Sequence, residues 1–171
     1  MAESLTLLRP WRITDKVALA ENANNINIWN NVRDYFPHPY SEKDGEEFIQ
    51  MVLAKPEPVV DFAIEVDGVV VGGIGVVPGK DTERISAEMG YWLGEKYWNK
   101  GIVSRAISEM VNYVFTELPI TKLFAGVYSH NPASMRVLEK AGFVKEGILR
   151  KTAIKNGVVV DIHYYGLVKP D

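Results

Sequence analysis

Two short segments carry residues whose types and spacing could do chemistry. The first covers residues 90–106 and reads GYWLGEKYWNKGIVSRA, a strand, a short polar loop and a long helix that begins at Gly101. A helix start presents unpaired backbone N–H groups and the positive end of the helix dipole, and such a place binds phosphate. Gly101 lets a pyrophosphate approach closely, and Lys100 adds a positive charge. An ordinary strand-to-helix turn has the same pattern, so this segment alone leaves both interpretations open.

The second segment covers residues 128–143 and reads YSHNPASMRVLEKAGF. Asn131 and Ser134 are three residues apart, so they lie on one face of the predicted helix. Asn131 is also a good N-cap and Pro132 a good first helical residue, so helix capping accounts for them equally well. Capping and a functional role are compatible at these positions.

Together the two segments resemble the cofactor-binding half of the GNAT superfamily of N-acetyltransferases. Gly101 corresponds to the first glycine of its Gln/Arg-x-x-Gly-x-Gly/Ala loop, and the run from Asn131 and Ser134 to Gly142-Phe143 resembles its ribosomal-protein-alanine acetyltransferase (RimJ/RimL-like) branch. Looser similarities in LTLLRP, FPHPYS and AEMGYWL extend the resemblance over nearly the whole chain. It implies an α/β fold with a mixed, twisted sheet of about seven strands, helices on both faces, and an acetyl-CoA cleft between splayed strands.

The resemblance also implies which residues bind acetyl-CoA, the co-substrate. They are Tyr91, Leu93, Trp98, Asn99, Lys100, Gly101, Ile102, Val103, Ser104 and Asn131. Tyr91 and Leu93 would pair through their main chain with the pantetheine arm. Trp98 stands where many relatives have Gln or Arg, Asn99 replaces a usual Gly, and Val103 replaces the second Gly or Ala. Because the phosphate site uses backbone amides, these changes need not abolish it.

Acetyl transfer from a thioester to an amine needs a neutral amine and, as a smaller aid, an acid for the departing thiolate. Many GNAT enzymes place a Tyr acid seven residues after the Asn, but this chain has Leu138 there, so we assign the role to Ser134. Glu88, on the strand before the loop, is the candidate base, with water or a cross-strand ion pair as alternatives. Asp61 and Glu65, on the preceding hairpin, are alternative bases, although we expect them to face solvent.

Other chemistry-bearing residues give weaker signals. No two of the three histidines, His38, His130 and His163, have metal-ligand spacing, so we predict no metal. Four aromatic residues line an acceptor pocket or belong to the core: Trp29, Tyr35, Phe36 and Tyr40.

Periodicity and turn residues predict the elements that position these groups. We expect strands over 4–9, 59–66, 69–77, 84–93, 120–127, 143–154 and 158–168, and helices over 18–23, from Ser41 to before Pro56, and over 101–116 and 132–140. The asparagine-rich stretch 22–31 predicts irregular helical structure. Ser41, with Asp44 three residues on, predicts a capped helix start, and Asn156-Gly157 predicts a tight turn between the last two strands. We treat residues 1–171 as a single N-acetyltransferase domain.

Composition limits the function classes. The 171 residues are 47% apolar and carry a net charge of -3, which argues against nucleic acid or an anionic membrane surface as the main partner. The chain contains no Cys, which excludes a disulfide framework. We expect a cytoplasmic enzyme, monomeric or homodimeric, that acetylates a primary amine such as a protein N-terminus or a small amine. The alternatives are a non-catalytic acyl-CoA-binding regulatory domain and, with less support, a dinucleotide-binding module, whose glycine fingerprint is missing.

Overall fold

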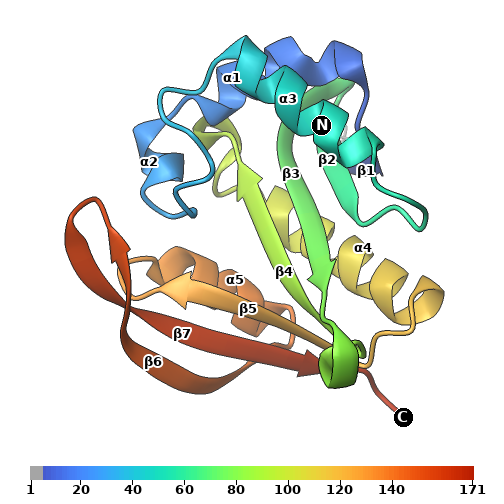
Figure 1. The fold of residues 1–171 in the computed structure, drawn as a ribbon, viewed down its shortest axis with the longest axis vertical. Coiled ribbons are helices and arrows are strands. Elements are labelled where there is room, and N and C mark those ends of the chain that lie inside the picture. Colours follow the sequence, from blue (N-terminus) through green and yellow to red (C-terminus); the bar gives the residue numbers. More distant parts are fainter. Residues whose placement is uncertain (1–5) are drawn as a thin grey trace. The chain divides into compact units, whose positions relative to one another are not determined.

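The computed structural model describes residues 6–171, and its elements are drawn in Figure 1. The strands are β1 (Thr6–Pro10), β2 (Asp61–Val66), β3 (Val69–Pro78), β4 (Ser86–Leu93), β5 (Lys122–Tyr128), β6 (Val144–Lys155) and β7 (Val158–Val168). The α-helices are α1 (Lys16–Ala23), α2 (Ile26–Trp29), α3 (Glu42–Leu53), α4 (Ile102–Glu117) and α5 (Pro132–Lys140). Three short 3-10 turns are η1 (Ile13–Asp15), η2 (Asp81–Glu83) and η3 (Glu95–Tyr97).

These elements confirm the predicted strands and helices, with shifts of about one or two residues at their ends. Ser4 and Leu5 of the predicted first strand lie outside the described residues. The irregular stretch contains a helix of its own, α2, because the Asn25 side chain caps it by accepting from two backbone N–H groups.

The seven strands form one mixed sheet in the order β1-β2-β3-β4-β5-β7-β6. The β6–β7 hairpin turns at Asn156-Gly157, where both residues have positive φ, as a tight turn of this kind requires. Strands β4 and β5 pair in parallel from Ser86 with Lys122 to Glu88 with Phe124. The predicted α/β fold with about seven strands is therefore confirmed.

The chain divides into two compact units, one with the residues up to Gly75 and Tyr91–Ala106, the other with Val76–Gly90 and Ile107–Asp171. In the first unit, α1 and α3 bury an apolar core against β2 and β3. That core contains Trp11, Leu19, Ala20, Ala23, Tyr40, Ile49, Val52, Ala63 and Val70. The capping box predicted for α3 is present: the Asp44 N–H donates to the Ser41 hydroxyl, and the Ser41 N–H donates to the Asp44 carboxylate.

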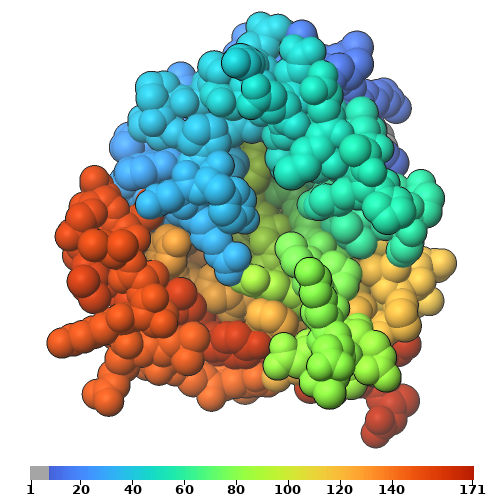
Figure 2. Space-filling view, in the orientation of Figure 1, coloured from blue at the N-terminus to red at the C-terminus, as the bar shows by residue number. Residues whose placement is uncertain are grey.

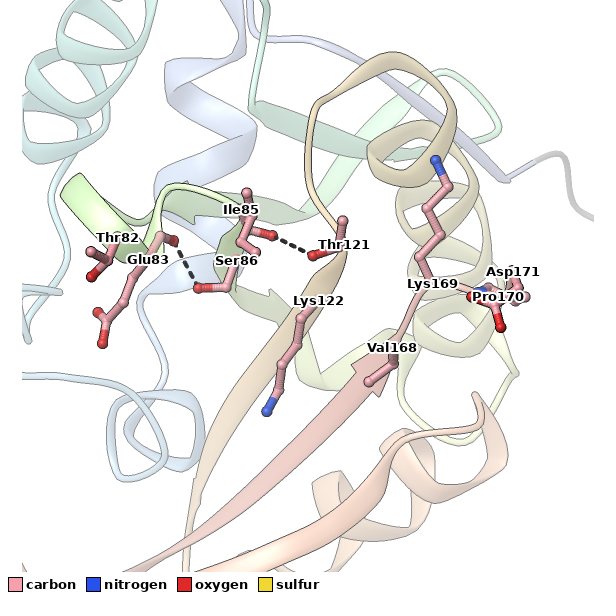
Figure 3. Close-up of a pocket in the computed structure, with 10 residues that line it drawn as sticks. All are labelled: Thr82, Glu83, Ile85, Ser86, Thr121, Lys122, Val168, Lys169, Pro170 and Asp171. Atoms are coloured by element: carbon pink, nitrogen blue, oxygen red, sulfur yellow. Dashed lines mark hydrogen bonds between the residues drawn. The ribbon is translucent and has the colours of Figure 1, made fainter.

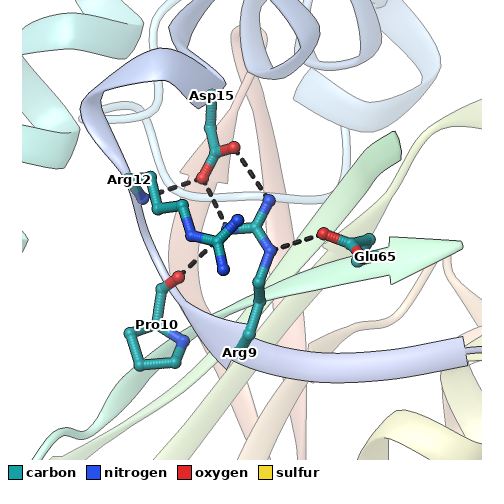
Figure 4. Close-up of polar contacts among 5 residues, drawn as sticks. All are labelled: Arg9, Pro10, Arg12, Asp15 and Glu65. Carbon is teal, nitrogen blue, oxygen red and sulfur yellow. Dashed lines mark hydrogen bonds and ion pairs between the residues drawn. The ribbon is translucent and has the colours of Figure 1, made fainter. Parts of the chain in front are cut away.

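A polar network ties β1 to the start of α1 and to β2 (Figure 4). The Arg9 guanidinium donates to both oxygens of Asp15, each at 2.9 Å, and to the Glu65 carboxylate. The Arg12 N–H also donates to Asp15, at 2.8 Å. Burial alone would raise the pKa of Asp15, but the bonds from Arg9 and Arg12 outweigh it and hold that pKa below its ordinary value.

We expect Asp15→Asn to lower the free energy of unfolding by about 2 kcal/mol at pH 7, because it removes a charge-assisted pair from a buried site. A carboxylate with a lowered pKa contributes stability above its ordinary pKa of about 4, and that stability is lost as the pH falls through its folded-state pKa. The gap between the two proteins should therefore shrink from pH 7 to pH 3. Urea unfolding at both values measures it, and a constant gap would contradict the assignment.

The second unit contains α5 and the β5–β7–β6 part of the sheet. The buried Tyr165 hydroxyl donates to Glu139 of α5 at 2.9 Å, which fixes the helix against β7. The far end of the β6–β7 hairpin is exposed, including Ile154, Val158 and Val159. Figure 2 shows this end, in orange to red, at the surface.

Candidate active site

The loop that follows β4 is fixed at several points within the first unit. The Gly94 N–H donates to the Val71 carbonyl at 2.7 Å, and the Trp98 indole donates to the Leu93 carbonyl at 2.8 Å. An added Cβ on Gly94 would lie 2.5 Å from the Asn22 amide oxygen, so a larger residue there would displace the Asn22 side chain. These bonds fix the direction in which the loop enters η3, and the Trp98 bond ties the end of the loop back to β4.

The backbone of this loop turns twice through the left-handed region. Asn99 has φ +60° and Gly101 has φ +73°. Asn is among the non-glycine residues that best tolerate this conformation. This explains why Asn99 can stand where the GNAT loop pattern usually has glycine. A Cβ on Gly101 would have no atom within 4 Å, so the space beside it is open to an incoming group.

Helix α4 begins directly after Gly101. Its hydrogen-bond ladder starts with the Arg105 N–H, which donates to the Gly101 carbonyl at 3.1 Å. By helix geometry the amides of residues 102–104 precede that ladder and point out of the helix start. The Lys100 ammonium lies 5.6 Å from the centre of the Tyr97 ring, which keeps a positive charge on the same loop. All the predicted residues from Tyr91 to Ser104 are therefore in one continuous segment.

Glu88 lies in the second unit, half-buried on β4. Its neighbours along the strand, Ala87 and Met89, are buried, so Glu88 points to the other face. Its partner in the parallel register is Phe124, whose ring stacks on Tyr164 with centroids 5.1 Å apart. This aromatic pair beside the carboxylate was not predicted, because the sequence does not give the register of strands so far apart.

Several charged groups affect the pKa of Tyr164. Burial raises the pKa of Tyr164, the Lys122 ammonium opposes the rise, and the carboxylates of Glu146, Glu88 and Glu83 add to it. Lys122 donates to Glu146 at 2.6 Å. The negative charge of Glu88 therefore contributes to the raised pKa of Tyr164, as expected for two groups on one face of the sheet.

Asn131 and Ser134 lie at the start of α5. Asn131 is the N-cap, and its side-chain oxygen accepts from the Ser134 N–H at 3.3 Å. Pro132 is at the start of the helix as predicted. Leu138, at the position of the family's usual Tyr, is completely buried and packs in the core. The predicted face with Asn131 and Ser134 at one helix start is thus present.

The other carboxylates do not behave as expected. We predicted that Asp61 and Glu65 would face solvent, and this was wrong: their side chains are 19% and 18% exposed. Asp61 accepts from Lys55 at 2.6 Å, and Glu65 pairs with Arg9. Cations on neighbouring elements hold both of them.

The aromatic cluster near the N-terminus divides between core and surface. Phe36 packs against Trp92 at 5.6 Å, and Tyr40 is buried beside it. Tyr35 is 83% exposed, and Trp29 faces the His38 ring at 5.9 Å. Among residues 6–171, no group of three or more acidic or histidine side chains is arranged to hold a metal ion.

A recess of about 610 Å³ lies in the second unit (Figure 3). Its lining comes from Thr82, Glu83, Ile85, Ser86, Thr121, Lys122, Val168, Lys169, Pro170 and Asp171. These residues surround the beginnings of β4 and β5, whereas both chemistry-bearing segments follow the ends of those strands. None of the predicted site residues lines the recess. Over residues 6–171, every helix is too short or too polar to cross a bilayer.

Comparison with known proteins decides the family. Residues 6–144 match the model of the acetyltransferase (GNAT) domain. The chain belongs to the GNAT acetyltransferase family. The SPbeta prophage-derived uncharacterized N-acetyltransferase YokL of Bacillus subtilis (strain 168) is 33% identical to this GNAT chain over 140 residues, which cover 81% of the chain and 77% of YokL.

A shorter curated match and a more distant solved structure also resemble this GNAT chain. The uncharacterized N-acetyltransferase YoaA of Bacillus subtilis (strain 168) is 42% identical over 84 residues, 49% of the chain and 48% of YoaA. The chain spans about half the length of several curated relatives it matches. RimJ of Mycobacterium smegmatis, solved with CoA-disulfide, shares the fold with a TM-score of 0.85 and 22% identity over 95% of this chain and 81% of RimJ.

Proposed function

We propose that this GNAT chain is an acetyl-CoA-dependent N-acetyltransferase of the cytoplasm, acting on a primary amine. One observation carries the proposal: a left-handed Gly101, with open space beside it, leads directly into the 16-residue helix α4. Backbone amides at a helix start, the dipole and a glycine without a side chain are the features that bind a pyrophosphate.

The residues present fit acetyl-CoA. The amides of residues 99–104 would hold the pyrophosphate, and Lys100 would add charge. The main chain of Tyr91 and Leu93 would pair with the pantetheine arm. The Leu93 carbonyl also accepts from the Trp98 indole, which holds this end of β4 against the loop. The fold neighbour RimJ was solved with a CoA compound, which supports the same class of ligand here.

In the proposed reaction, Glu88 would take the proton of the acceptor ammonium, and the resulting neutral amine attacks the thioester carbonyl. The C–N bond forms and the C–S bond breaks, while Ser134 would donate its hydroxyl hydrogen bond to the departing sulfur. The attacking nitrogen loses its second proton to water, and the CoA thiolate takes up a proton from water to become the thiol. Phe124, the partner of Glu88, is four residues before the end of β5, about 13 Å along the strand. Glu88 therefore does not lie next to the start of α5 that carries Ser134, and we propose that the amine proton reaches Glu88 through water.

The test is thiol release from acetyl-CoA in the presence of peptides with free N-termini, amino acids and polyamines. We expect release that depends on both enzyme and amine. Binding of acetyl-CoA without release for any amine would support the regulatory-domain alternative instead. Release from one acceptor class would also identify the substrate, which the residues alone leave open.

Ser134→Ala should lower kcat by roughly tenfold to a hundredfold, about 1–3 kcal/mol of barrier, because a thiolate already leaves well and needs only modest help. Affinity for acetyl-CoA should stay within about twofold, since the N–H bond to Asn131 does not involve the hydroxyl. Steady-state kinetics and a melting curve on the same variant separate the roles. A lower melting temperature with normal kcat would assign the hydroxyl to helix stability instead.

A further inference from the structure

The asparagine-rich stretch before α3 has a partner in the loop that follows β4. The Asn25 amide donates to Glu95 Oε2 at 2.6 Å. The Asn27 amide donates to Glu95 Oε1 at 3.1 Å and to Oε2 at 3.3 Å. All three residues belong to the first unit. Two asparagines therefore hold one carboxylate by both of its oxygens.

The direction of the Asn25 amide is fixed by its own helix. Its oxygen caps α2 by accepting from the Asn27 N–H at 2.8 Å and the Ile28 N–H at 3.3 Å. The nitrogen must then point away from α2, and it points at Glu95. The bonds from Asn25 and Asn27 hold the pKa of Glu95 below its ordinary value, as expected for donors that favour the ionised form.

Glu95 occupies a sensitive place in the loop. It is the first residue of η3, directly after Gly94, and six residues before Gly101. The two left-handed residues, Asn99 and Gly101, follow η3 with little regular structure between them. A change in the direction of η3 would therefore move the amides at the start of α4 relative to the strand.

We propose that Asn25, Asn27 and Glu95 form a positioning clamp that holds the loop between β4 and α4 in the shape that binds the pyrophosphate of acetyl-CoA. This inference rests on the proposed function. None of the three side chains needs to touch the ligand. The clamp acts by raising the fraction of molecules whose loop is competent to bind, and the apparent dissociation constant varies inversely with that fraction.

Loss of the clamp should weaken acetyl-CoA binding and leave chemistry at saturation unchanged. Asn25→Asp is the sharpest variant, because Asp caps a helix as well as Asn but places a second carboxylate against Glu95. We expect about tenfold weaker acetyl-CoA binding for Asn25→Asp and for Glu95→Gln at pH 8, with kcat within twofold of the parent. Lowering the pH toward 5 should recover most of the loss in Asn25→Asp, since two facing carboxylates can then share a proton.

Combining the two substitutions should restore the contact with reversed polarity. The new Gln amide would donate to the new Asp carboxylate, and the net charge equals that of the parent chain. We expect the double variant to bind acetyl-CoA within about threefold of the parent. Glu21→Gln, on an exposed residue of α1, is the control for loss of one negative charge and should bind normally.

Isothermal titration of the full chain with acetyl-CoA, with melting temperatures alongside, decides the outcome. No binding by the parent chain would refute the proposed function itself. Normal binding by the parent and by both single variants would overturn the clamp alone. The clamp would also be overturned if the double variant lost as much acetyl-CoA binding free energy as the two single variants lose together. Only a direct contact between the two positions predicts a rescue.

Discussion

Replacing Gly101 with Val should weaken acetyl-CoA binding by about a hundredfold, which corresponds to about 2.7 kcal/mol of binding free energy. A valine side chain would fill the open space beside Gly101, where the pyrophosphate is expected to approach. It would also strain a residue with φ +73°, so the loop would tend to leave its left-handed conformation. Calorimetric titration with acetyl-CoA measures the loss.

A matched control separates backbone strain from the ligand site. Gly157, in the β6–β7 turn, has φ +75° and likewise no atom within 4 Å of an added Cβ. Gly157→Val and Gly101→Val should therefore lower the free energy of unfolding by similar amounts, of order 1–3 kcal/mol. Acetyl-CoA binding should stay normal in Gly157→Val. Equal affinity in Gly101→Val and the parent chain would show that the pyrophosphate binds elsewhere.

Replacing Glu88 with Gln should lower kcat by about a hundredfold at neutral pH, the lower end of what a general base contributes. Gln keeps the shape of the side chain on β4 but cannot accept the amine proton. The deficit should shrink as the pH rises past the pKa of the acceptor, about 8 for an α-amine and about 10 for a lysine-like amine, because the amine is then already neutral. A pH–rate profile measures this directly.

Glu83→Gln is the control for that experiment, since Glu83 is an exposed carboxylate on η2 whose charge also reaches Tyr164. It should leave kcat unchanged. If Glu88→Gln keeps the kcat of the parent at every pH, water alone removes the amine proton, and Glu88 serves the sheet face beside Phe124.

Local sequence signals predicted much of the fold. Three features depend on at most four consecutive residues, and each is found as expected. They are the Asn156-Gly157 turn, the Ser41–Asp44 capping box and the Asn131-Pro132 helix start. Such features depend on a few neighbouring dihedral angles, so short-range patterns determine them.

Contacts between distant segments could not be predicted in the same way. Phe124 lies beside Glu88 because of a parallel register, and Glu95 meets Asn25 across 70 positions of sequence. We expected Glu65 to face solvent, but Arg9 on the neighbouring strand pairs with it. In each case the partner is set by tertiary packing, which overrides the local pattern.

The sequence predicted the candidate site residues only in part. The sequence identified Gly101 as a helix-start glycine, and the positive φ gives the physical reason. It marked Asn99 as a departure from the family pattern, whereas φ +60° at that position makes Asn a suitable substitute for glycine. The assignment of Glu88 and Ser134 to the reaction stays a prediction.

The measurement that tests the central claim most directly is isothermal titration of the full chain with acetyl-CoA. We predict saturable binding of one acetyl-CoA per chain, together with a rise in unfolding free energy of about 2.7 kcal/mol when the ligand is at 100 times its dissociation constant. Absence of any binding heat and of any stabilisation at millimolar acetyl-CoA would contradict the proposed cofactor, and with it the acetyltransferase activity.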